Sequence, residues 1–164
     1  MEPAIYHPNR DKAESKATKA IVVMLLLASA GLTLVITLGG WSALQGSQPF
    51  AFAYAILNLV MAYFVARWNR GVLPVAAALA VLFGVLAAIA APSWFARDQT
   101  GFADPALDPG LLGLLTVILV PVQALLVAFA MRAFSQQWNV EVEVDDEHYA
   151  GPPPRSGSPE PLGA

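Results

Sequence analysis

The sequence predicts an all-α membrane protein with four transmembrane helices in an up-down bundle. Of its 164 residues, 57% are hydrophobic and only 13% are charged, about half the charged share of a soluble domain. Four apolar stretches hold no Asp, Glu, Lys, Arg or His. Each matches a hydrocarbon core of about 30 Å at about 1.5 Å of rise per residue. The Lys and Arg residues also gather on one side of these stretches.

Backbone groups in lipid find no hydrogen-bond partners outside their own segment, so each apolar stretch is predicted to be helical. The transmembrane domain is predicted to cover residues 20–138. The fourth helix begins where Asp108 can cap it and Pro109 fits its first turn. It continues toward Trp138, about two turns past Met131. The predicted helices cover residues 20–39, 50–67, 72–91 and 109–137.

The first helix has an alternative interpretation as a cleaved signal peptide. Lys16 and Lys19 precede an apolar run that reaches Ala28-Ser29-Ala30, a pattern of small residues typical of cleavage sites. The run continues to Leu38 without a polar region around that site. A retained transmembrane helix is therefore the favoured interpretation.

The distribution of basic residues predicts the orientation. Near the ends of the predicted helices, only Arg97 is basic on one side of the membrane, and seven basic residues lie on the other. Because an excess of Lys and Arg stays in the cytoplasm, both termini are expected there. The Ala- and Pro-rich composition favours a bacterium of high GC content, and hence its inner membrane. The seven are Arg10, Lys12, Lys16, Lys19, Arg67, Arg70 and Arg132.

One tryptophan follows each predicted helix. Indole rings favour the headgroup level of a bilayer, so these residues are predicted to be interface anchors, two on each side. They are Trp41, Trp68, Trp94 and Trp138.

Two segments lie outside the predicted membrane domain. Residues 1–19 form a cytoplasmic segment in which Asn9 is a candidate cap for a short helix through Lys19 that could continue into the first membrane helix. Residues 139–164 form a second one, first acidic and then rich in proline. Apolar and acidic residues alternate over 140–145, which predicts either a strand on a partner or an extended stub. Residues 151–164 are predicted to be a disordered tail.

The composition disfavours most chemistry. The chain has no Cys, which excludes thiolate nucleophiles, disulfides and thiolate-bound clusters. The only histidines, His7 and His148, lie in the terminal segments, so haem ligation within the membrane is not expected. No nucleotide, zinc or hydrolase motif is present. We therefore expect no catalytic residue, metal or cofactor, and a net charge of −3 without a basic stripe argues against nucleic acid.

A weak alternative is an enzyme acting on lipids at the outer surface. Asp98, Asp104 and Asp108 would supply its carboxylates. No paired base, nucleophile or metal set accompanies them, so this alternative ranks last.

Two amides lie near the centres of their predicted helices, Asn58 in the second and Gln123 in the fourth. Uncharged amides in hydrocarbon are costly without partners, so both are expected to point inward, where they could bond to each other. The second and fourth helices are therefore predicted to face each other at this depth. Interhelical contact is the favoured role, and a polar point on a transport path is the alternative. Nearby Pro121 frees the carbonyl near Val117, which Gln123 or Thr116 could help to satisfy, and the resulting kink is a packing feature more often than a gate.

The third helix carries small residues at every fourth position, and such a seam lets another helix approach closely. Packing within the monomer and packing against an oligomer or partner remain open alternatives. The seam residues are Ala76, Ala80, Gly84 and Ala88.

The four apolar stretches thus contain no carboxylate, Lys or His, which disfavours transport driven by protons or ions. The predicted function is a non-enzymatic accessory, scaffolding or assembly subunit of a membrane complex. Its expected partners are the lipid bilayer and either another membrane protein or further copies of this chain. The alternative is a small transporter or channel for a neutral or lipidic substrate.

Overall fold

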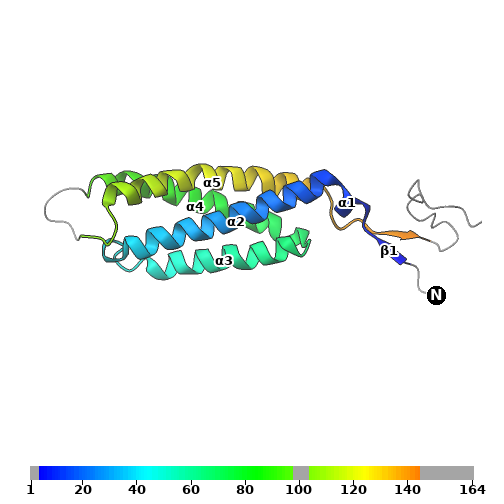
Figure 1. Cartoon of the computed structure of the whole chain (residues 1–164), viewed down its shortest axis with the longest axis horizontal. Helices are drawn as coiled ribbons and strands as arrows, with labels where there is room; N and C mark the ends of the chain where they lie inside the picture. Colours follow the sequence, from blue (N-terminus) through cyan, green and yellow to red (C-terminus); the bar gives the residue numbers. More distant parts are fainter. Residues whose placement is uncertain (1–3, 98–103, 145–164) are drawn as a thin grey trace, which may run out of the picture.

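Four long helices dominate the computed structural model, which describes residues 4–97 and 104–144. The helices are α2 (Ala13–Gly39), α3 (Gln48–Ala66), α4 (Leu73–Phe95) and α5 (Pro109–Ser135). They lie side by side along one axis (Figure 1). Each is long and apolar enough to cross a membrane, which confirms the predicted set of four helices.

The helices extend beyond the apolar stretches that predicted them. Helix α2 begins at Ala13 rather than at residue 20, because nothing in residues 13–19 breaks a helix. A separate turn of helix, α1 (Pro8–Asp11), precedes it and is flanked by His7 rather than capped by Asn9. Lys12 has an extended backbone and separates α1 from α2. Hydropathy therefore located the membrane segment but not the start of the helix.

Helix α5 begins as predicted. The Asp108 carboxylate accepts a hydrogen bond of 3.0 Å from the backbone N–H of Leu111, and Pro109 occupies the first turn. This contact satisfies one of the N–H groups that a helix start leaves without a partner.

The connections define two ends of the bundle. At the loop end, a short 3-10 helix, η1 (Trp41–Ala43), joins α2 to α3, and residues 104–108 lead into α5. The backbone N–H of Leu107 donates to the Gly39 carbonyl at 3.0 Å. A side chain at Gly39 would overlap Leu107, so a glycine is required at this contact.

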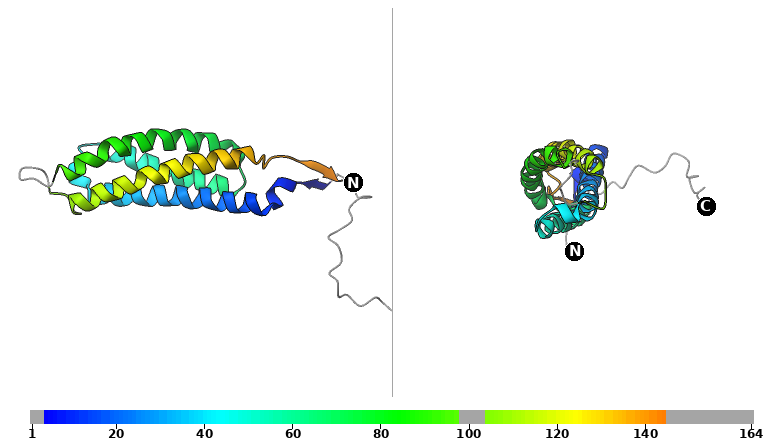
Figure 2. Two further views of the ribbon diagram at one scale, coloured as in Figure 1. Left: turned by 90° about the horizontal axis from the view of Figure 1, so that it is seen from above. Right: turned by 90° about the vertical axis from the view of Figure 1, so that its left-hand side faces the viewer.

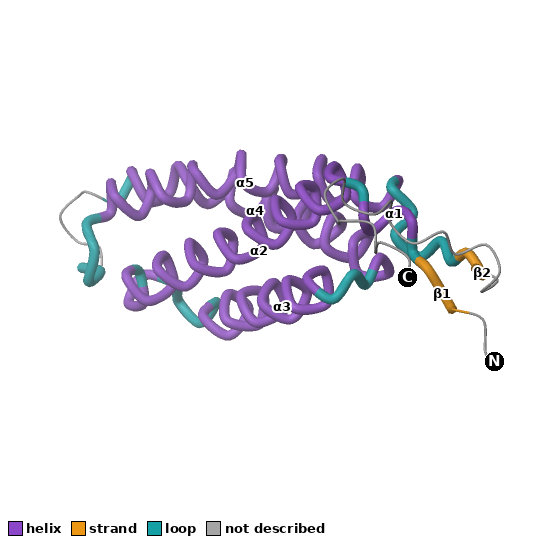
Figure 3. The backbone as a smooth tube through the Cα atoms, turned by 45° about the vertical axis from the view of Figure 1, so that its right-hand side comes forward, coloured by secondary structure: helices purple, strands orange, loops and turns teal. Residues whose placement is uncertain are grey.

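The terminal end carries both ends of the described chain. Strand β1 (Ala4–Tyr6) pairs antiparallel with β2 (Val142–Val144), with Ile5 opposite Glu143. The two strands extend past the ends of the helices (Figure 3). The strand expected on a partner or as a stub thus pairs with the chain's own N-terminal residues. Residues 145–164, which include the predicted disordered tail, lie outside the described residues.

The helices pack unevenly around the bundle axis. Helix α4 lies against α5 over most of its length, and α2 contacts both α3 and α5 extensively. Helices α3 and α4 are joined by the short 3-10 helix η2 (Arg70–Val72), yet their backbones come close together at few positions. The end-on view shows the four helices around a common centre (Figure 2). One side of the bundle, between α3 and α4, is therefore weakly closed.

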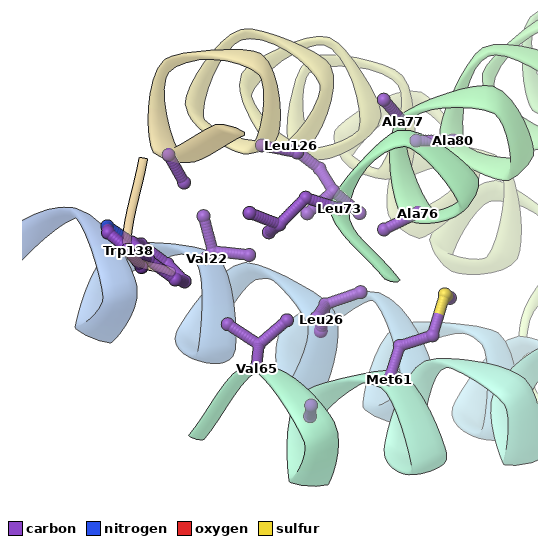
Figure 4. Close-up of a cluster of buried hydrophobic side chains, with 13 residues drawn as sticks. Val22, Leu26, Met61, Val65, Leu73, Ala76, Ala77, Ala80, Leu126 and Trp138 are labelled. Carbon is purple, nitrogen blue, oxygen red and sulfur yellow. The ribbon is translucent and has the colours of Figure 1, made fainter. Parts of the chain in front are cut away.

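The interior divides into two groups of buried side chains. The terminal core lies near the terminal end, where side chains of all four helices meet Trp138 (Figure 4). Its largest members include Trp138, Leu26, Leu73 and Leu126, all fully buried. The loop core is smaller and lies near the loop end. It comprises Ile36, Ala43, Ala87, Trp94, Leu112 and Leu119.

Candidate functional site

A buried polar cluster lies at mid-length of the bundle and joins three helices. The Gln123 amide nitrogen donates to the Ser29 hydroxyl at 2.7 Å, and its oxygen accepts from the Tyr54 hydroxyl at 2.9 Å. Ser29 belongs to α2, Tyr54 to α3 and Gln123 to α5. All three side chains are buried. Their hydrogen bonds cross the bundle where hydrocarbon would offer none.

Asn58 is also buried, but its bonds differ from those expected. Its amide nitrogen donates to the Tyr54 carbonyl at 2.9 Å, one turn earlier in the same helix. Its oxygen has no hydrogen-bond partner among the described residues. Gln123 bonds to Ser29 and Tyr54, so Tyr54 provides the link from α3 that we had considered for Asn58.

Tyr54 was missed by the sequence analysis, although a signal for it was present. It precedes Asn58 by four residues and therefore lies on the same face of α3. Its ring also stacks on Phe83 of α4, with centroids 3.6 Å apart and planes inclined by 7°. A tyrosine combines an apolar ring with a polar hydroxyl, so Tyr54 can stack on Phe83 and also donate a hydrogen bond to the Gln123 amide.

Neither Thr116 nor Gln123 forms the hydrogen bond considered for the Val117 carbonyl, which Pro121 leaves without its helical partner. Thr116 donates to the Leu112 carbonyl at 2.7 Å, and Gln123 is engaged in the polar cluster. The expectation that either side chain would cap Val117 is therefore wrong. Contacts with neighbouring helices compete for the same polar groups and decide the outcome.

The small-residue seam of α4 serves mainly the monomer. Ala76 and Ala80 are buried in the terminal core. A Cβ at Gly84 would lie 3.1 Å from the Cβ of Gln123, so this glycine allows α4 and α5 to approach closely. Ala88 is exposed. Packing inside the monomer therefore accounts for the first three positions of the seam.

A lateral groove opens between α3 and α4 in the loop half of the bundle. Its volume is about 540 Å³, within the usual range for small-molecule sites. Helices α2 and α5 supply its floor, and α3 and α4 its walls. The residues around it are Thr33, Ile36, Thr37, Leu44, Ser47, Phe50, Ala51, Phe83, Leu86, Ala87, Ile89, Ala90, Ser93, Trp94, Thr116 and Leu119.

The groove is apolar in effect, although five hydroxyl side chains line it. Thr37 and Thr116 donate to carbonyls of their own helices at 2.6 and 2.7 Å. Ser93 donates to the Ala90 carbonyl in α4 at 2.6 Å, and Ser47 donates to the Leu44 carbonyl in the connection between α2 and α3 at 2.7 Å. Thr33 differs, because its hydroxyl is buried without a hydrogen-bond partner among the described residues.

The groove continues into a smaller hollow of about 210 Å³ at the loop end. The two hollows share Leu44, Ser47, Ala90, Ser93 and Trp94. We call the smaller hollow the mouth of the groove. Arg97 lines this mouth, and its guanidinium carbon lies 5.7 Å from the centroid of the Trp94 ring.

The four tryptophans take different environments. Trp41 is 52% exposed, as expected for an interface anchor, and Trp68 is half-buried. Trp94 and Trp138 are 5% and 0% exposed. These two rings are enclosed by protein, because each fills space in one of the cores rather than facing the bilayer.

Cations and aromatic rings cross-link the terminal end. The Lys19 ammonium lies 3.9 Å from the centroid of Trp68, whose ring meets Trp138 edge to face at 5.2 Å. Arg10 donates to the Trp138 carbonyl at 3.0 Å, and Arg70 donates to the Phe134 carbonyl at 2.7 Å. Basic residues expected to set orientation thus also bind the N- and C-terminal segments together.

The remaining candidates offer little chemistry. The described residues contain no group of three or more metal-ligating side chains. Asp108 is engaged as a helix cap, and the Asp104 carbonyl accepts from Ser42 at 3.1 Å. His7 lies 3.4 Å from the Val140 carbonyl. Asp98 and His148 lie outside the described residues.

Comparison with protein-family models, curated proteins and solved structures finds no match to this chain. Function must therefore be argued from the geometry of the polar cluster, the lateral groove and the terminal end.

Proposed function

We propose that this protein is a non-enzymatic accessory or assembly subunit of a complex in a bacterial inner membrane. One observation carries the proposal: three polar side chains that meet at mid-length bond to one another between helices. Ser29, Tyr54 and Gln123 bond to one another inside the bundle, and none of them carries a charge. A side chain committed in this way holds helices together rather than guiding a solute.

The proposed orientation follows from the basic residues. Lys19, Arg10 and Arg70 all lie at the terminal end, whereas Arg97 lies at the loop end. The bias of Lys and Arg toward the cytoplasm supports cytoplasmic termini and an external loop end.

The absence of cysteine makes a direct test of orientation possible. Single-cysteine variants Ser42→Cys and Lys12→Cys place one thiol at each end of the bundle, both at exposed positions. A membrane-impermeant maleimide should label Ser42→Cys in intact cells and Lys12→Cys only after permeabilisation. Labelling in the opposite order would reverse the orientation.

The subunit role predicts a partner with defined stoichiometry. The full chain, tagged at its C-terminus and purified in a mild detergent, should have a mass that equals one copy plus one identified membrane protein. Deleting the gene for this chain should lower the amount of that partner in the membrane. A lone monomer, with the partner unaffected by the deletion, would contradict the role.

The lateral groove favours a second candidate function, a small transporter for a lipidic substrate. Its apolar lining suits an acyl chain better than it suits a hydrated solute. Purified protein in liposomes would then speed the transfer of a fluorescent phospholipid between leaflets. Dithionite quenching of the outer leaflet measures this transfer, and a rate equal to that of empty liposomes would exclude the candidate.

A further inference from the structure

The two ends of the described chain form a small unit outside the helical bundle, which we call the latch. It consists of residues 4–11 and residues 140–144, and its strands extend past the ends of the helices (Figure 3). We infer that the latch opens as one unit while the four helices stay packed, with Lys12 and Asn139 as its hinges. This motion is a property of the chain itself and does not depend on the proposed subunit role.

Contacts with backbone groups hold the latch closed. Strands β1 and β2 pair over three residues each, and the ring nitrogen Nδ1 of His7 lies 3.4 Å from the Val140 carbonyl oxygen. The side chains of Asn9 and Arg10 donate to the carbonyls of residues 137 and 138, both at 3.0 Å. Each of these contacts joins the N-terminal segment to the C-terminal one, so the two segments release each other when the latch opens.

The latch itself buries little apolar surface. No residue of α1 is buried. Ile5 is 62% exposed, and Val142 is 44% exposed. A two-stranded sheet on its own is marginally stable in water, and segments with few buried apolar contacts open at the smallest cost in free energy. Opening the latch therefore costs much less than unfolding a helix of the bundle.

The residues that precede the C-terminal part of the latch are anchored in the bundle. Trp138 is fully buried in the terminal core, and its indole N–H donates to the Gln136 side chain at 3.1 Å. The Gln136 amide donates in turn to the Thr18 hydroxyl of α2 at 3.0 Å. The Asn139 side-chain oxygen accepts from the Arg70 guanidinium at 2.9 Å. These side chains do not belong to the latch, so Trp138 keeps the core closed when the latch opens.

The N-terminal hinge is Lys12. Its backbone is extended between α1 and α2, and its side chain is exposed. One ion pair, between Asp11 and Lys16 at 3.7 Å, crosses this hinge. Both of these side chains are more than half exposed, and exposed pairs of this kind contribute little to stability. Opening at the hinge leaves the edge of β2 and the carbonyls of residues 137 and 138 without their N-terminal partners.

Hydrogen exchange measures the opening directly. The full chain in dodecyl maltoside is transferred to deuterated buffer and digested, and mass spectrometry follows peptides from the latch and from the helices. We expect the backbone amides of residues 4–11 and 140–144 to exchange at least about a hundredfold faster than those in the middle of α2 and α5.

A pair of variants tests whether the two segments of the latch open together. Arg10→Gln removes the guanidinium bond to the Trp138 carbonyl, and it should raise the exchange of residues 140–144 about fivefold. Exchange in α2 and α5 should stay unchanged, because the Trp138 ring remains in the core. Lys12→Gln is the matched control, since this side chain is exposed, and it should leave the exchange of residues 140–144 unchanged.

A designed cross-link tests the pairing of the strands. The chain has no cysteine of its own. Ile5 lies opposite Glu143, and opposite residues of antiparallel strands have Cα atoms about 4.5–5.5 Å apart, within reach of a disulfide. Oxidation of the double variant Ile5→Cys, Glu143→Cys with copper phenanthroline should slow the exchange of residues 4–6 and 142–144 at least about tenfold. The control is Ile5→Cys with Val142→Cys, which belong to opposite faces of the sheet and should form at least about tenfold less disulfide.

Either of two results would overturn the inference. Exchange in the latch as slow as in α2 and α5, or faster exchange in α2 and α5 caused by Arg10→Gln, would show that the latch opens only when the bundle unfolds. Exchange of residues 140–144 that responds neither to Arg10→Gln nor to the oxidised cross-link would show that the two segments move separately.

Discussion

In the terminal half of the bundle, large side chains fill the space between the helices, whereas in the loop half the space between α3 and α4 stays open. Trp138, Leu26 and Leu73 are fully buried in the terminal core. The loop core contains fewer buried residues and borders a groove of about 540 Å³. The same two helices, α3 and α4, take part in both halves. Closure therefore depends on which side chains stand between them.

The difference separates two roles within one bundle. The terminal half is held by a filled core, by cations on aromatic rings and by paired terminal strands. The loop half is positioned by contacts around Gly39 and Gly40, where Leu107 and Trp94 leave no room for another side chain. A well-packed half supports the bundle, and an incompletely packed half is available to bind.

Removing the ring of Trp138 from the terminal core should lower the stability of the protein more than any other substitution considered below. Trp138→Ala empties a fully buried site in the terminal core, and such truncations cost about 3–5 kcal/mol. Thermal unfolding in dodecyl maltoside, followed by circular dichroism, measures the loss. Trp41→Ala, at a ring that is 52% exposed, is the control and should change stability by less than about 0.5 kcal/mol. Similar losses for both variants would contradict the contrast.

The same substitution placed in each half compares their packing directly. Ala80 is fully buried in the terminal core, whereas Ala90 lines the groove. Ala80→Leu should cost about 1–3 kcal/mol through overpacking, and Ala90→Leu should cost less than about 0.5 kcal/mol because the groove has room. The same thermal assay applies. An equal cost at both positions would show that the groove is closed in solution.

The polar cluster between the two halves should respond less than the terminal core does. Gln123→Leu leaves the Tyr54 and Ser29 hydroxyls without their amide partner. We expect a loss of about 1–2 kcal/mol. Asn58→Leu is the matched control, since the oxygen of Asn58 already lacks a partner, and it should cost under about 0.5 kcal/mol. A larger loss of stability for Asn58→Leu than for Gln123→Leu in the thermal assay would show that Asn58 makes the main polar contact between helices.

The smallest predicted effect concerns the floor of the groove. Thr33→Val removes a buried hydroxyl that has no hydrogen-bond partner among the described residues and keeps nearly the same shape. We expect the protein to become more stable by up to about 1 kcal/mol. Thr37→Val is the control and should lose a little stability, because Thr37 donates to the Thr33 carbonyl at 2.6 Å. Destabilisation by Thr33→Val would reveal a bond that the hydroxyl makes in the membrane.

Much of the fold followed from local features of the chain. The four helices and the cap at Asp108 were predicted, because the length of an apolar run and the position of a cap depend only on neighbouring residues. The helix through Lys19 does continue into the first membrane segment, but it begins at Ala13 rather than after Asn9, because Lys12 has an extended backbone.

The candidate sites were predicted only in part. The burial of Asn58 and Gln123 agrees with the expectation that amides turn inward. The hydrogen-bond partners of these amides were not predicted. Tyr54 and Ser29 come from helices whose rotation depends on the packing of every side chain along them. The groove left no trace in the sequence, since its walls have the same composition as any lipid-facing helix.

The sequence by itself determined that this chain has helices able to cross a membrane, how many, and where one of them is capped, since hydropathy and capping act over a few residues. Only the tertiary structure decided that α3 and α4 part at the loop end, that Tyr54 joins the polar cluster and that β2 pairs with β1. These features depend on the fit of side chains from distant segments. That fit is set by shape and by the competition for partners, which no single stretch of the chain contains.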